Sequence, residues 1–230
     1  MKSVAIMIIF LCLIGCGNEN NPIPNTAEND VNEQVESTKG SLNDPISDLI
    51  TVTGPMTISS NDMYPIIQKN YLLNLQLVKG RYYEDWSPSP YKGRGWTGEF
   101  QLVISDDYGN VKSIFQISDY FTEDLIFNAL FEIEFDDYNG DANIDFTIGQ
   151  YGSSNGNFYK IFTITDDDQI KELPVKGIPE LFISGGTNRY STKLDKLDDV
   201  SFKKTAYDNS IGKDIEATFI WEGNEFVRTE

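Results

Sequence analysis

The stretch EFQLVI, residues 99–104, sets the fold class of this chain because its apolar and polar residues alternate. Its phenylalanine, leucine and isoleucine then fall on one face, as the two-residue period of a β-strand requires. Residues 106–110 (DDYGN) supply turn chemistry, and residues 111–117 resume the alternation. The sequence therefore predicts a β-hairpin at this point.

A two-residue period also marks a later segment. Phe131, Ile133 and Phe135 form an apolar stripe, while Glu132 and Glu134 face the other way. This pattern favours an extended segment with one buried face.

The remaining apolar segments of the second half read as strands as well. Residues 158–164 (FYKIFTI) carry apolar side chains on both faces, which is typical of an interior strand buried on two sides. A turn at residues 166–168 and a strand at residues 170–173 follow. Near the C-terminus, residues 215–221 and 225–228 flank a glycine-containing turn.

Two segments predict short helices. Residues 61–70 are interrupted by Pro65, and residues 122–130 begin with Thr122 as an N-cap followed by acidic residues. We therefore expect an all-β domain of antiparallel hairpins, in a blade-like or sandwich arrangement, with one or two short helices.

The composition changes near residue 46. Residues 17–46 are rich in Asn, Glu, Pro and Ser and hold too little apolar surface to offset the entropy of ordering, so they predict a disordered tether. Residues 47–230 alternate apolar and polar side chains and contain many aromatics. That length is sufficient for a single domain with one core.

The first residues carry the pattern of a targeting signal. Lys2 precedes an apolar run over residues 4–14, and the run closes in Leu13-Ile14-Gly15-Cys16. A membrane-spanning helix needs about 20 apolar residues, so this run is too short to be one. It predicts a signal peptide over residues 1–15. The alternative is an ordinary secretory signal with a cysteine nearby.

Residues 13–16 resemble the lipobox of bacterial lipoproteins. The resemblance implies that Cys16 receives a diacylglycerol and becomes the new N-terminus, and two acyl chains give stable membrane attachment. The expected location is the extracytoplasmic face of a bacterial cell membrane. A flexible tether of this length would reach roughly 30 Å from the bilayer.

The cysteine and histidine content and the net charge limit the kinds of site and partner that this chain can have. The chain has two cysteines, Cys12 in the predicted signal and Cys16 at the lipidation site, so the mature domain has no disulfide. The absence of histidine excludes Ser-His-Asp triads, Cys-His pairs and nearly all catalytic zinc sites. The net charge of −18, which becomes −19 once Lys2 is removed, disfavours nucleic acid and favours hard cations as partners.

The strongest chemical pattern is DYNGDANID, residues 137–145. Side-chain oxygens at alternate positions of such a loop can converge on one point, and a hard cation takes about six to eight oxygen ligands. Calcium tolerates this ligand number and an irregular geometry, whereas magnesium demands a tighter octahedron. The predicted ligands are Asp137, Asn139, Asp141 and Asp145 through their side chains and Asn143 through its main-chain carbonyl.

The segment from residue 135 to 149 resembles the strand-loop-strand calcium motif of FG-GAP and VCBS-type repeats. The match lies in the Asp-x-Asn-Gly-Asp core at residues 137–141 and in the final Asp145. It occurs once, so it implies an ion-binding loop and not a complete propeller. Those repeats carry glycine where this chain has Ala142, and a non-glycine residue at positive φ costs about 1 kcal/mol. An EF-hand is excluded because Ile148 stands where its bidentate glutamate would be.

Two interpretations of the loop stay open. One is a calcium site that is structural and weak, since extracellular calcium modules work at about 0.1–1 mM. The other is an Asx-rich turn that joins two strands without an ion, because Asp, Asn and Gly are the commonest turn residues.

A second candidate site is aromatic. Flat aromatic faces in a loop flanked by polar groups are typical of sugar-binding surfaces. The alternative is that Tyr83 and Trp96 only anchor a long loop to the core. The proposed ligand-binding residues are Trp86, Tyr91 and Trp96.

Two functional classes follow. The first is a non-catalytic, membrane-tethered module whose calcium-stiffened domain contacts envelope polymer or another surface protein. The second is a carbohydrate-binding protein or a carboxylate-based glycan hydrolase, which requires two acids about 5 to 9.5 Å apart in a cleft. No spacing singles out a pair among Glu132, Glu134, Asp136 and Glu216. We favour the first class, and a cleft with two convergent carboxylates, one with a raised pKa, would reverse that preference.

Overall fold

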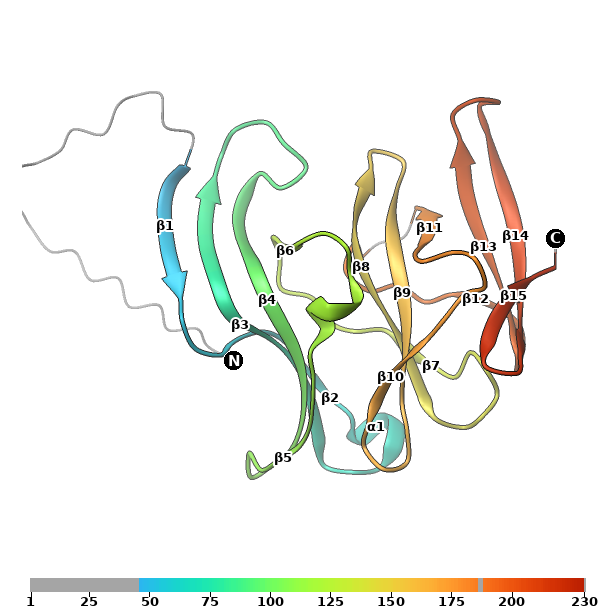
Figure 1. Ribbon diagram of the computed structural model, residues 1–230, viewed down its shortest axis with the longest axis horizontal. Coiled ribbons are helices and arrows are strands. Elements are labelled where there is room, and N and C mark those ends of the chain that lie inside the picture. The colour runs from blue at the N-terminus through green and yellow to red at the C-terminus, as the bar shows by residue number, and fades with distance from the viewer. Residues whose placement is uncertain (1–45, 186–187, 230) are drawn as a thin grey trace, which may run out of the picture. The chain divides into compact units, whose positions relative to one another are not determined.

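A computed structural model describes residues 46–185 and 188–229. The predicted signal peptide, Cys16 and almost all of the predicted tether lie outside the described residues. The described residues belong to one compact unit, which is nearly all β, as predicted, and consists of three antiparallel sheets (Figure 1).

The first sheet is built around two long strands that pair along most of their length. β3 pairs with β1 and β2 on one side and with β4 on the other, and β4 pairs in turn with β5 and β6. Its strands are β1 (Ile46–Val52), β2 (Met56–Asp62), β3 (Tyr71–Asp85), β4 (Gly93–Asp106), β5 (Val111–Phe115) and β6 (Leu125–Phe127).

The second sheet has β9 at its centre. β9 pairs with β8 on one side and with β10 and β11 on the other, and β7 pairs with the outer side of β8. Its strands are β7 (Phe135–Asp136), β8 (Ile144–Ser153), β9 (Gly156–Ile164), β10 (Ile170–Leu173) and β11 (Leu181–Ser184).

The third sheet is a four-stranded meander, in the order of its strands along the chain. It comprises β12 (Asp195–Asp198), β13 (Ser201–Asp208), β14 (Lys213–Glu222) and β15 (Glu225–Arg228).

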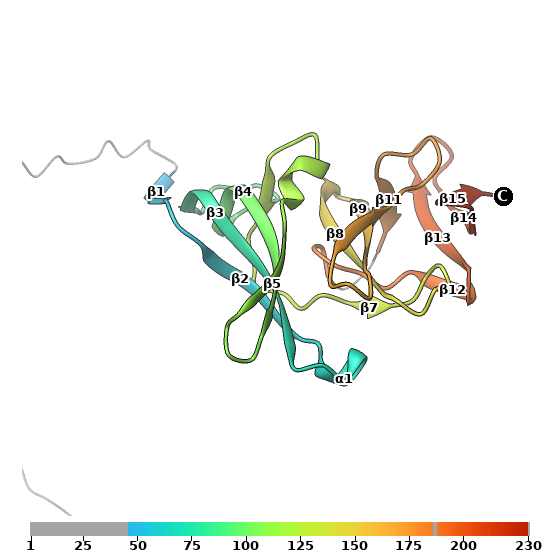
Figure 2. The ribbon, with the colours of Figure 1, turned by 60° about the horizontal axis from the view of Figure 1, so that its bottom comes forward.

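Two hydrophobic cores place the second sheet between the other two (Figures 1 and 2). Phe162 and Ile164 of β9 pack in the core shared with the first sheet, where Phe100 and Leu102 also lie. Ile161 of the same strand packs in the core shared with the third sheet. The prediction that residues 158–164 form a strand buried on both faces is therefore confirmed, and the sheets form a layered, sandwich-like stack.

The predicted hairpins are confirmed. β4 and β5 pair through Val103 opposite Ile114, and the turn between them closes when the Gly109 N–H donates to the Asp106 carbonyl at 2.9 Å. β9 and β10 form the second predicted hairpin, and β14 and β15 form the third.

One of the two predicted helices is present. Within residues 61–70 the chain forms one helical turn, α1 (Tyr64–Ile67), and a 3₁₀ turn, η1 (Ile117–Tyr120), lies elsewhere. The helix predicted over residues 122–130 is wrong, because Leu125 to Phe127 form β6 and pair with β4.

Candidate functional site

The acidic loop joins β7 to β8 as a strand-loop-strand unit. Phe135 pairs with Phe146 and Asp136 with Asp145, so the residues between them form the connection at the end of the second sheet. β8 begins at Ile144 and contains Asp145, so a strand and not the helix of an EF-hand follows the loop.

The loop curls around its own carboxylates. The Asp137 carboxylate accepts hydrogen bonds from the Gly140 N–H at 2.7 Å and from the Ala142 N–H at 3.1 Å. The Asp141 carboxylate accepts from the Asn143 N–H at 2.9 Å and from the Asn139 side-chain amide at 3.0 Å. These bonds bring the predicted ligands Asp137, Asn139, Asp141 and Asn143 together in one loop, with each carboxylate facing backbone donors.

Asp145 differs from the other acids of the loop because its side chain is completely buried. Its Oδ2 accepts from the Tyr138 N–H at 2.8 Å, whereas its Oδ1 makes no hydrogen bond within the described residues. Thr163 lies opposite Asp145 on β9. Its hydroxyl lies close enough to lower the pKa of the Asp145 carboxyl but makes no hydrogen bond of ordinary length. A buried carboxylate oxygen without a partner costs free energy.

The electrostatics of Asp145 reflect this environment. Burial raises the pKa of its carboxyl to about 7, and the negative charges of Asp141 and Asp137 act in the same direction. The Tyr138 N–H and the Thr163 hydroxyl act in the opposite direction, but burial prevails. A cation beside Asp145 would remove much of this penalty.

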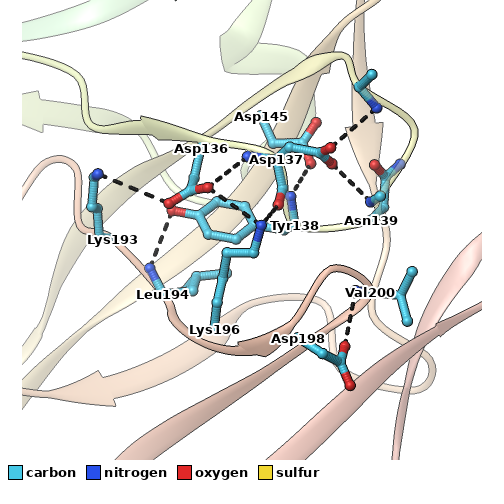
Figure 3. A network of polar contacts seen from close by, with 12 residues as sticks. Asp136, Asp137, Tyr138, Asn139, Asp145, Lys193, Leu194, Lys196, Asp198 and Val200 are labelled. Carbon is cyan, nitrogen blue, oxygen red and sulfur yellow. Dashed lines mark hydrogen bonds and ion pairs between the residues drawn. The ribbon is translucent and has the colours of Figure 1, made fainter.

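The loop also joins the second sheet to the third (Figure 3). The Lys196 ammonium of β12 donates to the Asp137 carbonyl and lies 3.5 Å from Asp136 Oδ1. The Tyr138 ring is fully buried in the core that the two sheets share, and its hydroxyl accepts from the Leu194 N–H at 3.2 Å. A change in the conformation of the loop would therefore alter the contacts that hold the third sheet to the second.

The fit of this loop to calcium rests on Asp145. Within the described ranges, no group of three or more Asp, Glu, His or Cys side chains that could hold a metal is found. The Asp137 and Asp141 carboxylates face loop N–H groups, so they would have to turn toward an ion. The unpartnered Asp145 oxygen is the atom that an ion would satisfy.

Ala142 adopts the strained backbone conformation that its sequence position predicts, with φ at +64°. We expect Ala142→Gly to raise the free energy of unfolding by about 1 kcal/mol, because glycine adopts positive φ without steric strain. Urea denaturation of the two proteins measures the difference. A loss of stability in Ala142→Gly would contradict a strained Ala142.

The three predicted aromatic residues lie in different environments. Trp96 packs against the first core and against Tyr82, at 5.8 Å between ring centroids, and the Tyr83 ring lies close against Gly95. Trp86 is 57% exposed. The structure thus agrees with an anchoring role for Trp96.

Tyr91 lines a cavity of about 590 Å³ between the first and second sheets. Its ring meets Tyr151 edge-on at 5.7 Å between centroids. Three carboxylates, Glu123, Asp124 and Glu180, share the wall with four aromatic rings. The remaining lining residues are Phe121, Thr122, Ile126, Gln150 and Phe158.

The Glu180 side chain of this cavity is partly buried. Burial raises the pKa of its carboxyl, and the nearby charges of Glu123 and Glu172 act in the same direction, while Lys160 opposes them. Sequence reasoning found Tyr91 but missed these acids. They lie in segments more than 50 residues apart, and no local pattern joins them.

Comparison with known proteins gives no family assignment, since no protein-family model, curated protein or solved structure matches the chain. Among the described residues, no helix combines the length and the apolar character that a membrane crossing requires. The functional conclusion therefore rests on the residues themselves.

Proposed function

We propose that this chain is a lipid-anchored protein of the extracytoplasmic membrane face, and that its domain is a non-catalytic module stiffened by calcium in the loop of residues 137–145. In this proposal the domain contacts envelope polymer or another surface protein, and the ion stabilises the junction between its second and third sheets. Nucleic acid is disfavoured as a partner by the net charge of −18.

The observation that carries the proposal is the buried Asp145 oxygen without a hydrogen-bond partner. It lies in the loop that also holds the Asp137 and Asp141 carboxylates, and both of these raise its pKa. Calcium would supply the missing partner and offset the repulsion among the three acids. The lipid anchor is supported by the sequence of residues 13–16.

Thermal unfolding of the full chain tests the ion site. We expect 5 mM calcium, about five times the weak end of the range for extracellular modules, to raise the melting temperature relative to EDTA. Asp141→Ala should abolish the rise, because it removes one charged ligand.

Asp107→Ala is the matched control, since Asp107 is an exposed aspartate in the β4–β5 turn. Its calcium-dependent rise should equal that of the unaltered chain. The absence of any calcium effect, or an undiminished effect in Asp141→Ala, would refute the ion site and leave the Asx-rich turn.

Membrane fractionation tests the anchor. Cys16→Ala removes the only thiol that the predicted processing leaves at the N-terminus, so the variant should move from the membrane to the soluble fraction. Cys12→Ala is the control and should stay membrane-bound. A membrane-bound Cys16→Ala protein would contradict lipid anchoring.

A second candidate function is a carbohydrate-binding protein or glycan hydrolase, and the cavity beside Tyr91 favours it. This cavity combines aromatic rings with three carboxylates, one of which has a raised pKa, as a catalytic acid requires. Glu123 and Asp124 are exposed to solvent, whereas Glu180 is partly buried, so the non-catalytic module stays the first proposal. Release of reducing ends from cell-wall polysaccharide, lost in Glu180→Gln, would support hydrolysis over the non-catalytic module.

A further inference from the structure

The cavity beside Tyr91 has an acidic lining. Glu123, Asp124 and Glu180 line it, and none of its lining residues is Lys or Arg. Within the described part of the chain, none of these three carboxylates makes a hydrogen bond or an ion pair. Glu180 is partly buried, and the Glu123 charge raises its pKa while the Lys160 charge opposes that rise. Glu123 and Asp124 are exposed to solvent.

The basic side chains nearest to the cavity, Lys160 and Arg189, have hydrogen-bond partners outside it. The Lys160 ammonium is buried, lies 2.6 Å from Glu172 and donates to the Pro179 carbonyl at 2.8 Å. The Arg189 guanidinium donates to the Pro90 carbonyl at 2.8 Å. Neither lines the cavity, so a cation that enters it meets carboxylates that have no ion-pair partner among the described residues.

Cations of the chain itself lie over three of the four aromatic rings of the lining. The Arg189 guanidinium lies 5.2 Å from the Tyr151 centroid and 5.8 Å from the Tyr91 centroid, and the Lys160 ammonium lies 5.9 Å from the Phe121 centroid. Rings that attract cations through their quadrupole, combined with carboxylates, are the chemistry that recognises organic ammonium groups. The volume of about 590 Å³ lies within the range of small-molecule sites.

We propose that the cavity formed by Tyr91, Phe121, Tyr151 and Phe158, with Glu123, Asp124 and Glu180, binds a small organic cation through an ammonium group. The aromatic faces contact the alkyl carbons around the nitrogen, and the carboxylates supply the countercharge. An organic ammonium group adds alkyl surface that contacts the rings, and a bare inorganic ion has none. The proposal does not depend on the calcium loop, because the two sites share no residue.

Isothermal titration calorimetry on the full chain in detergent tests this proposal with two pairs of probes. Tetramethylammonium is compared with sodium at equal concentration, and glucosamine with its uncharged N-acetyl derivative. We expect saturable binding of tetramethylammonium and glucosamine and none of sodium or N-acetylglucosamine. EDTA is present throughout, so that the state of the acidic loop does not enter the result.

Glu180→Gln keeps the shape of the side chain and removes its charge, and it should weaken tetramethylammonium binding by about tenfold. Glu222→Gln, an exposed glutamate at the end of β14, is the matched control and should bind as the unaltered chain does. Absence of binding by both ammonium probes, equal binding of the uncharged sugar, or unchanged binding in Glu180→Gln would each overturn the proposal. A second variant, Tyr151→Leu, should also weaken binding, and unchanged affinity there would overturn the role of the rings.

Discussion

Phe162→Ala should lower the free energy of unfolding by about 3–5 kcal/mol, the usual cost of removing a buried phenylalanine. Phe162 is fully buried on the central strand of the middle sheet. Its ring stacks on Phe146 at 5.7 Å between centroids and meets the Phe115 ring at the same distance, so it joins the first sheet to the second. Chemical denaturation with a two-state fit measures the loss.

Phe158→Ala is the control because Phe158 lies on the same strand but is 36% exposed. It should lose about 1 kcal/mol, as expected for a partly exposed side chain. Equal losses for the two variants would contradict the assignment of Phe162 to a core between sheets.

Gly98→Ala should destabilise the protein by about 3 kcal/mol or more. Gly98 faces Gly80 across β3 and β4, and an added Cβ would lie 2.2 Å from the Lys79 carbonyl oxygen and 2.6 Å from the Gly80 Cα. Both obstacles are backbone, so no side chain can rotate away. The φ of +141° adds strain.

The control for this variant separates the cost of positive φ from the cost of steric overlap with the neighbouring strand. Gly109 also has positive φ, at +83°, but an added Cβ there would meet no atom within 4 Å. Gly109→Ala should therefore cost only about 1 kcal/mol. If Gly98→Ala cost no more than Gly109→Ala, the close approach of β3 and β4 would be wrong.

The hairpins were predictable because their signals are local. The alternation of residues 99–104, the turn residues 106–110 and the next strand follow one another directly, so a short window holds the information. The same holds for β9 and β10 and for β14 and β15.

The wrong helix shows where local signals fail. Residues 122–130 begin with Thr122 and acidic residues, which favour a helix N-terminus. Leu125 and Phe127, two residues apart, are instead both fully buried in the first core and pair with β4. Tertiary burial on one face of a strand outweighed the capping signal, and the partner strand lies almost 30 residues earlier.

For the stripe of residues 131–135, the sequence predicted which side chains are buried but only part of the backbone structure. Ile133 is buried, and Glu132 and Glu134 are exposed, yet only Phe135 belongs to a strand. Here a side chain takes the place of a neighbouring strand as the hydrogen-bond partner of the backbone. The Ile133 N–H donates to Asn61 Oδ1 at 2.7 Å. Such long-range side-chain bonds leave no periodic signal in the sequence.

The two candidate sites also differ in how much of each could be predicted from local sequence. The acidic loop could be predicted from the sequence because all its candidate ligands lie in nine consecutive residues. The burial of Asp145 could not be predicted, since it depends on β9 and on the core beneath the loop. The cavity beside Tyr91 combines residues from five separate stretches of the chain, so only the folded chain brings its acids and rings together.

The most direct test of the account is calcium titration of the EDTA-treated chain by calorimetry, in parallel with Asp145→Asn. The variant keeps the size of the buried side chain and removes its charge. We predict one calcium ion bound per chain with a dissociation constant of about 0.1–1 mM, and no binding by Asp145→Asn. Absence of binding at 10 mM calcium, about ten times the weak end of that range, or equal binding by Asp145→Asn would contradict a calcium site built on Asp145.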